Sequence, residues 1–165
     1  MVQVTAYAKF LGNYDKLWGG DPLDAGIHFS GGFTERYETR NFQSDDEIQE
    51  LFKSLSEACH KSSIITCSTS YENKNAEILG LRNSHVYTIT KLCQFKIRDG
   101  VKYNTEAIVR IRNPWGEKEW IGAWSDYSDE MKSLKPRHKK RFGIELDNDG
   151  EFYMRISDFV KVRDS

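Results

Sequence analysis

Residues 110–126 read RIRNPWGEKEWIGAWSD, and this stretch joins a strand-like segment to an acidic, tryptophan-rich loop. Arginine and isoleucine alternate at its start, and the alternation stops at Asn113 and Pro114. Three indoles and three carboxylates follow the proline: Trp115, Trp120, Trp124, Glu117, Glu119 and Asp126. A strand that ends in one amide, three indoles and three acids directs attention to this loop as the first place to look for a function.

The composition predicts a soluble globular protein. The chain has 165 residues, which suits one domain or two small ones and is long enough to bury a core. Charged residues make up 30% and hydrophobic residues 38%, and the net charge is −1. Nucleic-acid binding depends on a basic surface, so no nucleic-acid partner is expected. The basic run at 135–141, KPRHKKR, is interpreted as a solvated face.

Cysteine usage and the N-terminus predict a cytoplasmic location. Cys59, Cys67 and Cys93 form no metal-ligand spacing, and an odd number without a framework fits a reducing compartment. The first residues show no signal peptide. No stretch approaches the roughly 20 apolar residues that a membrane span requires.

The periodicity predicts an α+β fold. Residues 5–18 carry a helical apolar stripe that Gly12 weakens, and glycine-rich loops follow. Residues 45–60 are the clearest helix, with Ser44 and Glu47 as a capping box. Beyond residue 62, four segments rich in β-branched and aromatic residues predict strands at 63–70, 85–97, 105–113 and 151–162. These would form antiparallel β-sheets or an open barrel, with flanking helices and long loops.

A hairpin would bring a histidine to an asparagine. If Asp99 and Gly100 form a two-residue turn, residue 98 lies opposite residue 101, and Asn113 becomes the diagonal neighbour of His85. The register could slip, because KYNT offers a second turn, and a one-residue bulge would make the pair direct. In Cys-His-Asn proteases an asparagine orients the histidine that activates a thiol. On the pair alone, a structural hydrogen bond at a sheet edge is the better interpretation.

The local sequences favour the protease. GLRNSHVYTIT (80–90), followed by the 110–126 stretch, resembles the second half of the calpain protease core. Calpains are calcium-dependent, papain-like cysteine proteases. Segments 6–20 (AYAKFLGNYDKLWGG), 28–38 (HFSGGFTERYE) and 149–159 (DGEFYMRISDF) extend the resemblance over nearly the whole chain. It implies a single domain over 1–165, the β-rich C-terminal half of such a core, with a helix and glycine-rich loops in 1–43 and a helix plus antiparallel strands in 44–165.

The resemblance also implies roles for individual residues. His85 would be the general base and Asn113 the residue that orients it. Trp115 would cover the pair when the site is assembled, and would wedge between the two halves of the cleft without calcium. An indole that excludes water beside His85 and Asn113 would strengthen their hydrogen bond. Ordinary core packing of Trp115 is compatible with the same sequence.

A calcium site is implied by the acidic residues that match the family. Its ligands would be Glu119, Asp126, Asp149 and Glu151, with Asp147 contributing a backbone carbonyl or a further carboxylate. Calcium takes six to eight oxygen ligands from flexible loops. Alone, the acidic turn near residue 149 would be read as solvated, and it lacks the spacing of an EF-hand loop. Calcium bound here would reposition the loop that carries Trp115.

The sequence departs from the family in two ways. No cysteine nucleophile motif is present, and Cys59 lies late in a predicted helix, where the dipole opposes a thiolate. The chain alone is therefore expected to be inactive, and its expected partner is a preceding subdomain that carries the cysteine. The resemblance also implies that the parent protein cleaves protein substrates and binds an inhibitor or a small subunit. Ser84 and Val86 replace the usual glycine and alanine beside His85. The alternative is a catalytically inactive, calcium-binding interaction module whose parent lacks the nucleophile.

Overall fold

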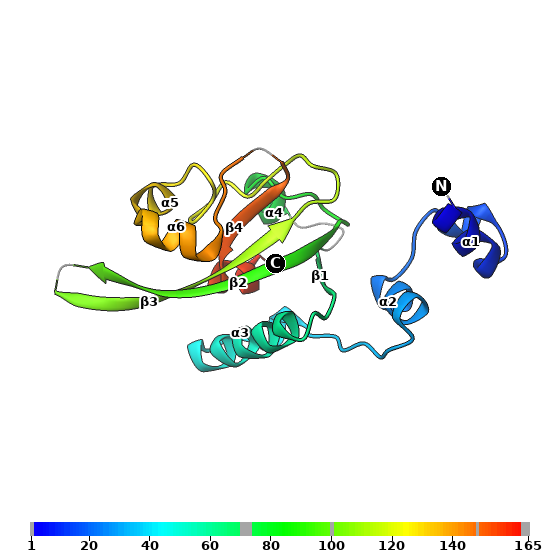
Figure 1. The fold of residues 1–165 in the computed structure, drawn as a ribbon, viewed down its shortest axis with the longest axis horizontal. Coiled ribbons are helices and arrows are strands. Elements are labelled where there is room, and N and C mark those ends of the chain that lie inside the picture. Colours follow the sequence, from blue (N-terminus) through cyan, green and yellow to red (C-terminus); the bar gives the residue numbers. More distant parts are fainter. Residues whose placement is uncertain (1, 70–73, 100, 148, 163–165) are drawn as a thin grey trace. The chain divides into compact units, whose positions relative to one another are not determined.

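The computed structural model describes residues 2–69, 74–99, 101–147 and 149–162, and Figure 1 traces them as a ribbon. The chain divides into two compact units, Met1–Tyr37 and Glu38–Ser165. Helices accompany one four-stranded antiparallel sheet, which confirms the predicted α+β class.

The first unit is helical. It contains α1 (Val2–Leu11), the 3-10 helix η1 (Tyr14–Leu17) and α2 (Pro22–Ser30). The helix predicted over 5–18 is interrupted at Gly12, whose φ of 109° lies in the region that favours glycine. Asp21 caps α2 by accepting a hydrogen bond from the backbone nitrogen of Leu23 at 2.9 Å.

This unit has little core of its own. Ala8 is the buried hydrophobic residue among its described positions. Its aromatic rings instead pack against one another, with the centroids of Tyr7 and Phe29 4.7 Å apart and the ring planes tilted by 35°. Trp18 and Phe33 leave 98% and 93% of their surface exposed.

The second unit is built around the sheet, whose strands follow the order β1-β2-β3-β4. The strands are β1 (Ile65–Ser68), β2 (Val86–Asp99), β3 (Lys102–Arg112) and β4 (Glu151–Arg155). The helices are η2 (Thr39–Asn41), α3 (Asp45–His60), α4 (Lys74–Ile78), α5 (Asp129–Ser133), α6 (Pro136–Phe142) and α7 (Ile156–Lys161). Every strand pairing is antiparallel.

The capping box at the start of α3 is confirmed. The Ser44 hydroxyl accepts from the backbone nitrogen of Glu47 at 3.3 Å, and the Glu47 carboxylate accepts from the backbone nitrogen of Ser44 at 2.8 Å. The apolar stripe of the helix is buried: Ile48, Leu51, Phe52 and Leu55. This local signal and the 3.6-residue spacing explain why the helix could be predicted within a residue.

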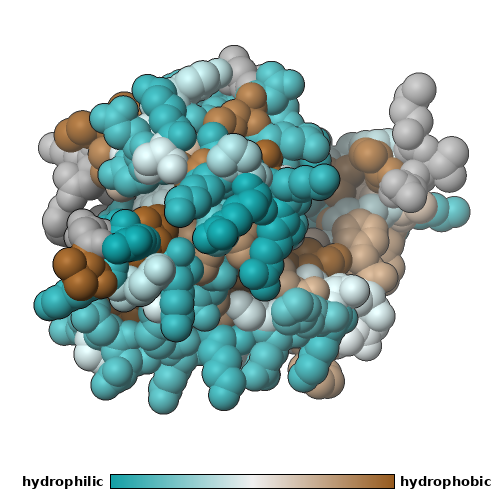
Figure 2. All heavy atoms as spheres, turned by 60° about the vertical axis from the view of Figure 1, so that its left-hand side comes forward, coloured by the Kyte–Doolittle hydropathy of each residue, from teal (hydrophilic) through white to brown (hydrophobic). Residues whose placement is uncertain are grey.

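Two hydrophobic clusters lie on opposite faces of the sheet. Val109 and Ile111 belong to the cluster that includes the stripe of α3, while Ile108 belongs to the cluster that includes Met131 of α5. This alternation follows from the two-residue period of a strand. Figure 1 shows α3 on one side of the sheet and α5 and α6 on the other. In Figure 2, hydrophilic residues cover most of the face in view.

Two details of the predicted strands are wrong. The predicted strand 151–162 ends at Arg155, and α7 follows, because Ile156 and Val160 are buried at helical spacing. In the hairpin Arg98 pairs with Tyr103 rather than with residue 101, so the register has slipped, a possibility that the sequence left open; the register also shifts between Ile89 and Lys91. Gly100, at the predicted turn, lies outside the described residues.

Candidate active site

The sheet brings His85 and Asn113 together at one edge. His85 immediately precedes β2, and Asn113 immediately follows β3, so the two antiparallel neighbours place them side by side. His85 Nε2 and Asn113 Oδ1 lie 2.8 Å apart, and both residues are buried. The predicted neighbourhood thus forms despite the different register, because both residues lie at the open end of the hairpin.

The loop after β3 fixes which end of the Asn113 amide faces His85. The amide nitrogen donates to the backbone carbonyl of Glu117, and the amide oxygen accepts from the backbone nitrogen of Trp115 at 3.0 Å. With an acceptor facing it, His85 Nε2 carries the proton in the neutral ring. Within the described part of the chain no hydrogen bond ends at Nδ1 of His85, so this nitrogen keeps a lone pair for a base's work.

Aromatic rings enclose the imidazole. The Tyr87 and Trp115 rings meet it edge-on, with centroid distances of 4.8 and 4.7 Å. The Tyr87 hydroxyl accepts from the backbone nitrogen of Arg82 at 2.8 Å, which ties this ring to the loop before His85. Trp115 remains 62% exposed and is therefore no core residue.

The other two tryptophans of the 110–126 stretch have a different place. Trp120 and Trp124 are buried in the two hydrophobic clusters, one on each face of the sheet. Trp120 donates from its indole nitrogen to the carbonyl of Ala123 at 2.8 Å. These two indoles stabilise the loop, and Trp115 is the indole of the three whose ring contacts that of His85.

Two glycines allow the loop after β3 to lie close to its neighbours. A Cβ on Gly80 would lie 2.2 Å from the carbonyl oxygen of Glu119. A Cβ on Gly150 would lie 2.7 Å from the Cα of Gly116 and 2.9 Å from the carbonyl oxygen of Asn113. Both glycines also have positive φ, so the backbone conformation and the close approach each favour glycine here.

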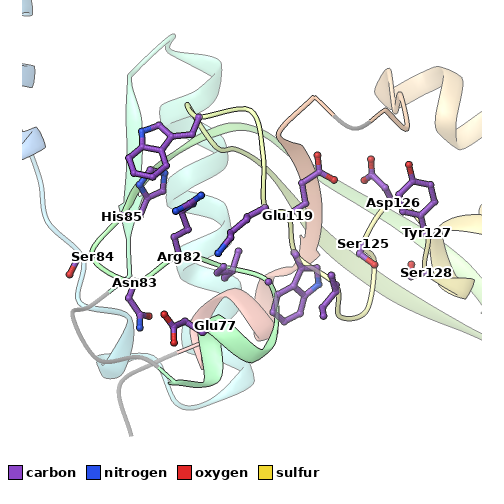
Figure 3. A pocket seen from close by; sticks show the side chains of 16 residues that line it. Glu77, Arg82, Asn83, Ser84, His85, Glu119, Ser125, Asp126, Tyr127 and Ser128 are labelled. Atoms are coloured by element: carbon purple, nitrogen blue, oxygen red, sulfur yellow. The ribbon is translucent and has the colours of Figure 1, made fainter.

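A cleft of about 880 Å³ runs along this loop. Its lining includes His85, Arg82 and Trp115, and extends to Glu119 and Asp126. Figure 3 shows Arg82 and His85 on one side of the cleft, with the carboxylates of Glu119 and Asp126 farther along it. His85 and two of the acidic residues, Glu119 and Asp126, therefore line one continuous cleft.

The acidic residues of this region repel one another. Asp126 is buried, and desolvation, followed by the charges of Glu119 and Asp149, raises the pKa of its carboxyl to about 7. Desolvation also raises the pKa of Glu119, and the charges of Asp149 and Asp147 add to this effect. Acids placed so that they repel one another are typical of sites that bind a cation.

The other acidic residues lie at the rim. Asp147 and Asp149 are exposed, and the Asp149 carboxylate accepts from the backbone nitrogen of Glu151 at 2.9 Å. Glu151 also forms an ion pair with Arg110, with an N–O distance of 3.4 Å. Glu119 accepts from the backbone nitrogen of Gly150 at 2.9 Å, which joins the two acidic loops.

The donor chemistry of these residues fits calcium. Both carboxylate oxygens of Asp126 are buried and meet no side-chain hydrogen-bond donor among the described residues, and carboxylate oxygens are the ligands that Ca²⁺ prefers. Over the described ranges, however, no three acidic, histidine or cysteine side chains are grouped as a ready-made metal site. The acidic residues that the resemblance implies as ligands therefore lie near enough to repel one another, but their described side chains are not grouped around one point.

None of the three cysteines has the surroundings of an activated nucleophile. Burial raises the pKa of Cys93 to about 11, and desolvation around the sulfur of Cys67 raises its pKa to about 12, although part of that residue stays exposed. Desolvation also raises the pKa of Cys59. A catalytic cysteine requires the opposite shift, toward the thiolate.

Sequence reasoning missed Arg82 and Tyr87 as parts of this site. The guanidinium of Arg82 lies over the Trp115 ring, 4.5 Å from its centroid, and forms an ion pair with Glu117 at 2.8 Å. Tyr87 follows His85 by two residues in the predicted strand 85–97, and the two-residue period of a strand, which places side chains two apart on one face, is the signal that could have found it. Both residues lie within the GLRNSHVYTIT segment that carries the resemblance, but the resemblance assigned neither of them a role.

The chain belongs to the calpain family of cysteine proteases. The family model for the "Calpain family cysteine protease" matches residues 2–165. The chain is 38% identical to Calpain-9 of Mus musculus over 160 residues, which cover 93% of this chain and 22% of the relative. It is 36% identical to Calpain-A of Drosophila melanogaster over 159 residues, which cover 94% of this chain and 19% of the relative. It is 34% identical to the Calpain-1 catalytic subunit of Homo sapiens over 160 residues, which cover 94% of this chain and 21% of the relative. The chain thus spans about a fifth of the length of these relatives.

Within the described ranges, none of the helices combines the length and the apolar character that a membrane crossing requires.

Proposed function

We propose that this chain is the His/Asn half of the catalytic core of a calcium-dependent cysteine endopeptidase. The observation that carries the proposal is the 2.8 Å contact between His85 Nε2 and Asn113 Oδ1, in which the amide is held by the loop after β3. A fixed imidazole with one free nitrogen is what a base that serves a thiol needs. Membership of the calpain family supports the same function.

His85 would act first as a base and then as an acid. Its Nδ1 would accept the proton of a cysteine thiol supplied by a preceding subdomain, and the resulting thiolate would attack a peptide carbonyl of a protein substrate. The imidazolium would then donate this proton to the leaving amine. Asn113 holds the ring in the required tautomer throughout, and Trp115 keeps water from one edge of the ring.

The acidic residues would hold calcium beside this machinery. Asp126 would supply buried carboxylate oxygens and Glu119 half-buried ones, and Asp147, Asp149 and Glu151 would complete the set from the rim. Bound calcium would supply positive charge that neutralises the mutual repulsion of these acids. Because Glu119 follows Trp115 by four residues, order in this loop and the position of the indole are coupled through the chain.

A fusion protein tests the proposal. The chain is joined to a Cys-bearing calpain subdomain, and cleavage of casein is measured with calcium and with EDTA. We expect calcium-dependent cleavage that is lost in His85→Ala and in a variant of the fused cysteine. Arg141→Gln, a change remote from the cleft, serves as the control and should cleave like the wild type.

Two results would separate the alternatives. Calcium binding without cleavage, in a fusion that folds, would favour a catalytically inactive calpain-like interaction module. Cleavage that persists in His85→Ala would contradict the assigned base.

A further inference from the structure

We propose that Arg82 is a positioning residue, which, together with Glu117, holds the Trp115 indole against the ring of His85. This inference rests on the proposed role of His85 and adds a residue to that site. Arg82 and Glu117 come from the two loops that the site joins: Arg82 precedes His85 by three residues, and Glu117 follows Trp115 by two.

The exposure of Trp115 shows that burial does not fix its position. The residue leaves 62% of its surface exposed, so the loss of apolar surface to water contributes less here than it does for a core indole. Trp124, in contrast, is 1% exposed and is held by its hydrophobic surroundings. An exposed ring needs specific contacts if it is to keep one orientation.

Two such contacts meet on the Trp115 ring. Its centroid lies 4.7 Å from that of His85, at an interplanar angle of 63°, and 4.5 Å from the guanidinium carbon of Arg82. The second distance is well within the roughly 6 Å at which a cation is attracted to the face of an indole. The ring of Trp115 is therefore in contact with both His85 and the guanidinium of Arg82.

Arg82 is itself held at both its backbone and its side chain. Its backbone nitrogen donates to the Tyr87 hydroxyl at 2.8 Å, and its carbonyl accepts from the Thr69 hydroxyl at 2.5 Å. Its Nη2 lies 2.8 Å from Oε1 of Glu117. Figure 3 shows Arg82 beside His85 on the wall of the cleft.

The ion pair orients the guanidinium more than it stabilises the fold. The Glu117 side chain is 68% exposed and that of Arg82 is 27% exposed, so water and salt screen their attraction. The ion pair instead fixes the orientation of the guanidinium, because a planar guanidinium that is held by a carboxylate can present its face to the indole. Removing either partner should therefore move Trp115 without unfolding the chain.

The test uses the 165-residue chain in a Trp18→Phe background, in EDTA. Trp115 is then the exposed indole among three, since Trp120 and Trp124 are buried. Acrylamide quenching reports the exposure of Trp115, and the ring-proton shifts of His85, assigned with His85→Gln, report whether the indole still lies beside it. Neutral acrylamide is used because the loss of a positive charge would itself alter quenching by an ion.

Arg82→Gln should increase the population of displaced indole by about two- to fivefold, the change that a cation–π contact at an exposed site represents. Quenching of Trp115 should rise and the His85 ring shifts should change. Glu117→Gln should shift both readouts in the same direction, and Arg82→Lys should restore part of the effect. Arg141→Gln removes a matched arginine, 5.4 Å from the Phe142 ring, and should change neither readout.

Unchanged quenching and unchanged His85 shifts in Arg82→Gln would overturn the proposal. If Arg82→Gln fails to fold, as its amide dispersion would reveal, Glu117→Gln decides the question by the same two readouts. Neither readout needs a nucleophile, so a fusion protein without protease activity would leave this result intact.

Discussion

His85 Nε2 lies 2.8 Å from Asn113 Oδ1, although 28 positions separate the two residues in the chain. The strands β2 and β3 bridge this separation, and the amide of Asn113 is oriented by the loop that carries Trp115. One loop thus determines both the tautomer of the histidine and the position of the indole beside it. Substitutions in this loop, in its supports and in the acidic residues next to it should therefore have separable effects.

The support of the loop by Gly150 predicts a large effect of a single methyl group. Gly150→Ala should destabilise the chain by about 1–3 kcal/mol, since the added Cβ would clash with the backbone of Gly116 and Asn113 at a positive φ. Urea unfolding measures the change. Gly19→Ala is the control, because no atom lies within 4 Å of its Cβ. Equal stability of the two variants would contradict the described close approach.

The backbone beside the base predicts a stabilising substitution. Ser84 has a φ of 48°, in the left-handed region that costs a non-glycine residue energy. Ser84→Gly should therefore stabilise the chain by about 0.5–1 kcal/mol after the extra entropy of glycine in the unfolded chain is subtracted. Ser63→Gly, at a position without positive φ, should be neutral or slightly destabilising. A loss of stability in Ser84→Gly would show that the hydroxyl makes a compensating contact.

The buried carboxyl of Asp126 predicts opposite effects with and without calcium. Asp126→Asn should raise Tm by about 2–4 °C at about pH 7.5 in EDTA, because it removes a repelled charge. Calcium should raise the Tm of the wild type and have less effect on the variant. Thermal unfolding in EDTA and in calcium measures both effects, and an equal calcium response in the two proteins would exclude Asp126 as a ligand.

The same carboxyl predicts the sign of a pH dependence. Its pKa is raised from 3.8 to about 7, so the folded protein holds the proton more tightly than the unfolded chain does. Without metal, stability should therefore fall as pH rises through this interval. Asp126→Asn should remove this contribution, which a comparison of urea midpoints at about pH 5 and about pH 7.5 measures. A wild-type slope equal to that of the variant would contradict the raised pKa.

The surroundings of the cysteines predict that the isolated chain is inactive and that its thiols react slowly with alkylating reagents. Raised pKa values leave little thiolate at Cys67 and Cys93 near neutral pH. The isolated chain should not cleave casein, and iodoacetamide should label these two residues far more slowly in the folded chain than in urea. Mass spectrometry of the labelled chain measures the rates. Cleavage that is abolished by changing one of the three cysteines would refute this prediction.

Some of this architecture can be predicted from the sequence because its causes are local. The capping residues of α3 and the helical spacing of its apolar side chains lie within one short segment. The meeting of His85 and Asn113 can be predicted even from a wrong hairpin register, since residues at the open end of a hairpin remain neighbours after a small slip.

Other features depend on the tertiary structure. The sequence of α7 wrongly predicts a strand, because its β-branched residues outweigh the helical spacing of Ile156 and Val160. The contact between Arg82 and Trp115 joins two loops that no pairing rule connects. The burial of Asp126 and its raised pKa likewise arise from the packing of distant segments.

The tautomer of His85 tests the central claim most directly. Long-range ¹H–¹⁵N NMR of the chain with a neutral imidazole identifies which ring nitrogen carries the proton, with His85→Gln for assignment. We predict a proton on Nε2 in the wild type and a mixture of tautomers in Asn113→Ala. A proton on Nδ1 in the wild type would contradict the proposed base, because the nitrogen assigned to the thiol would then be blocked.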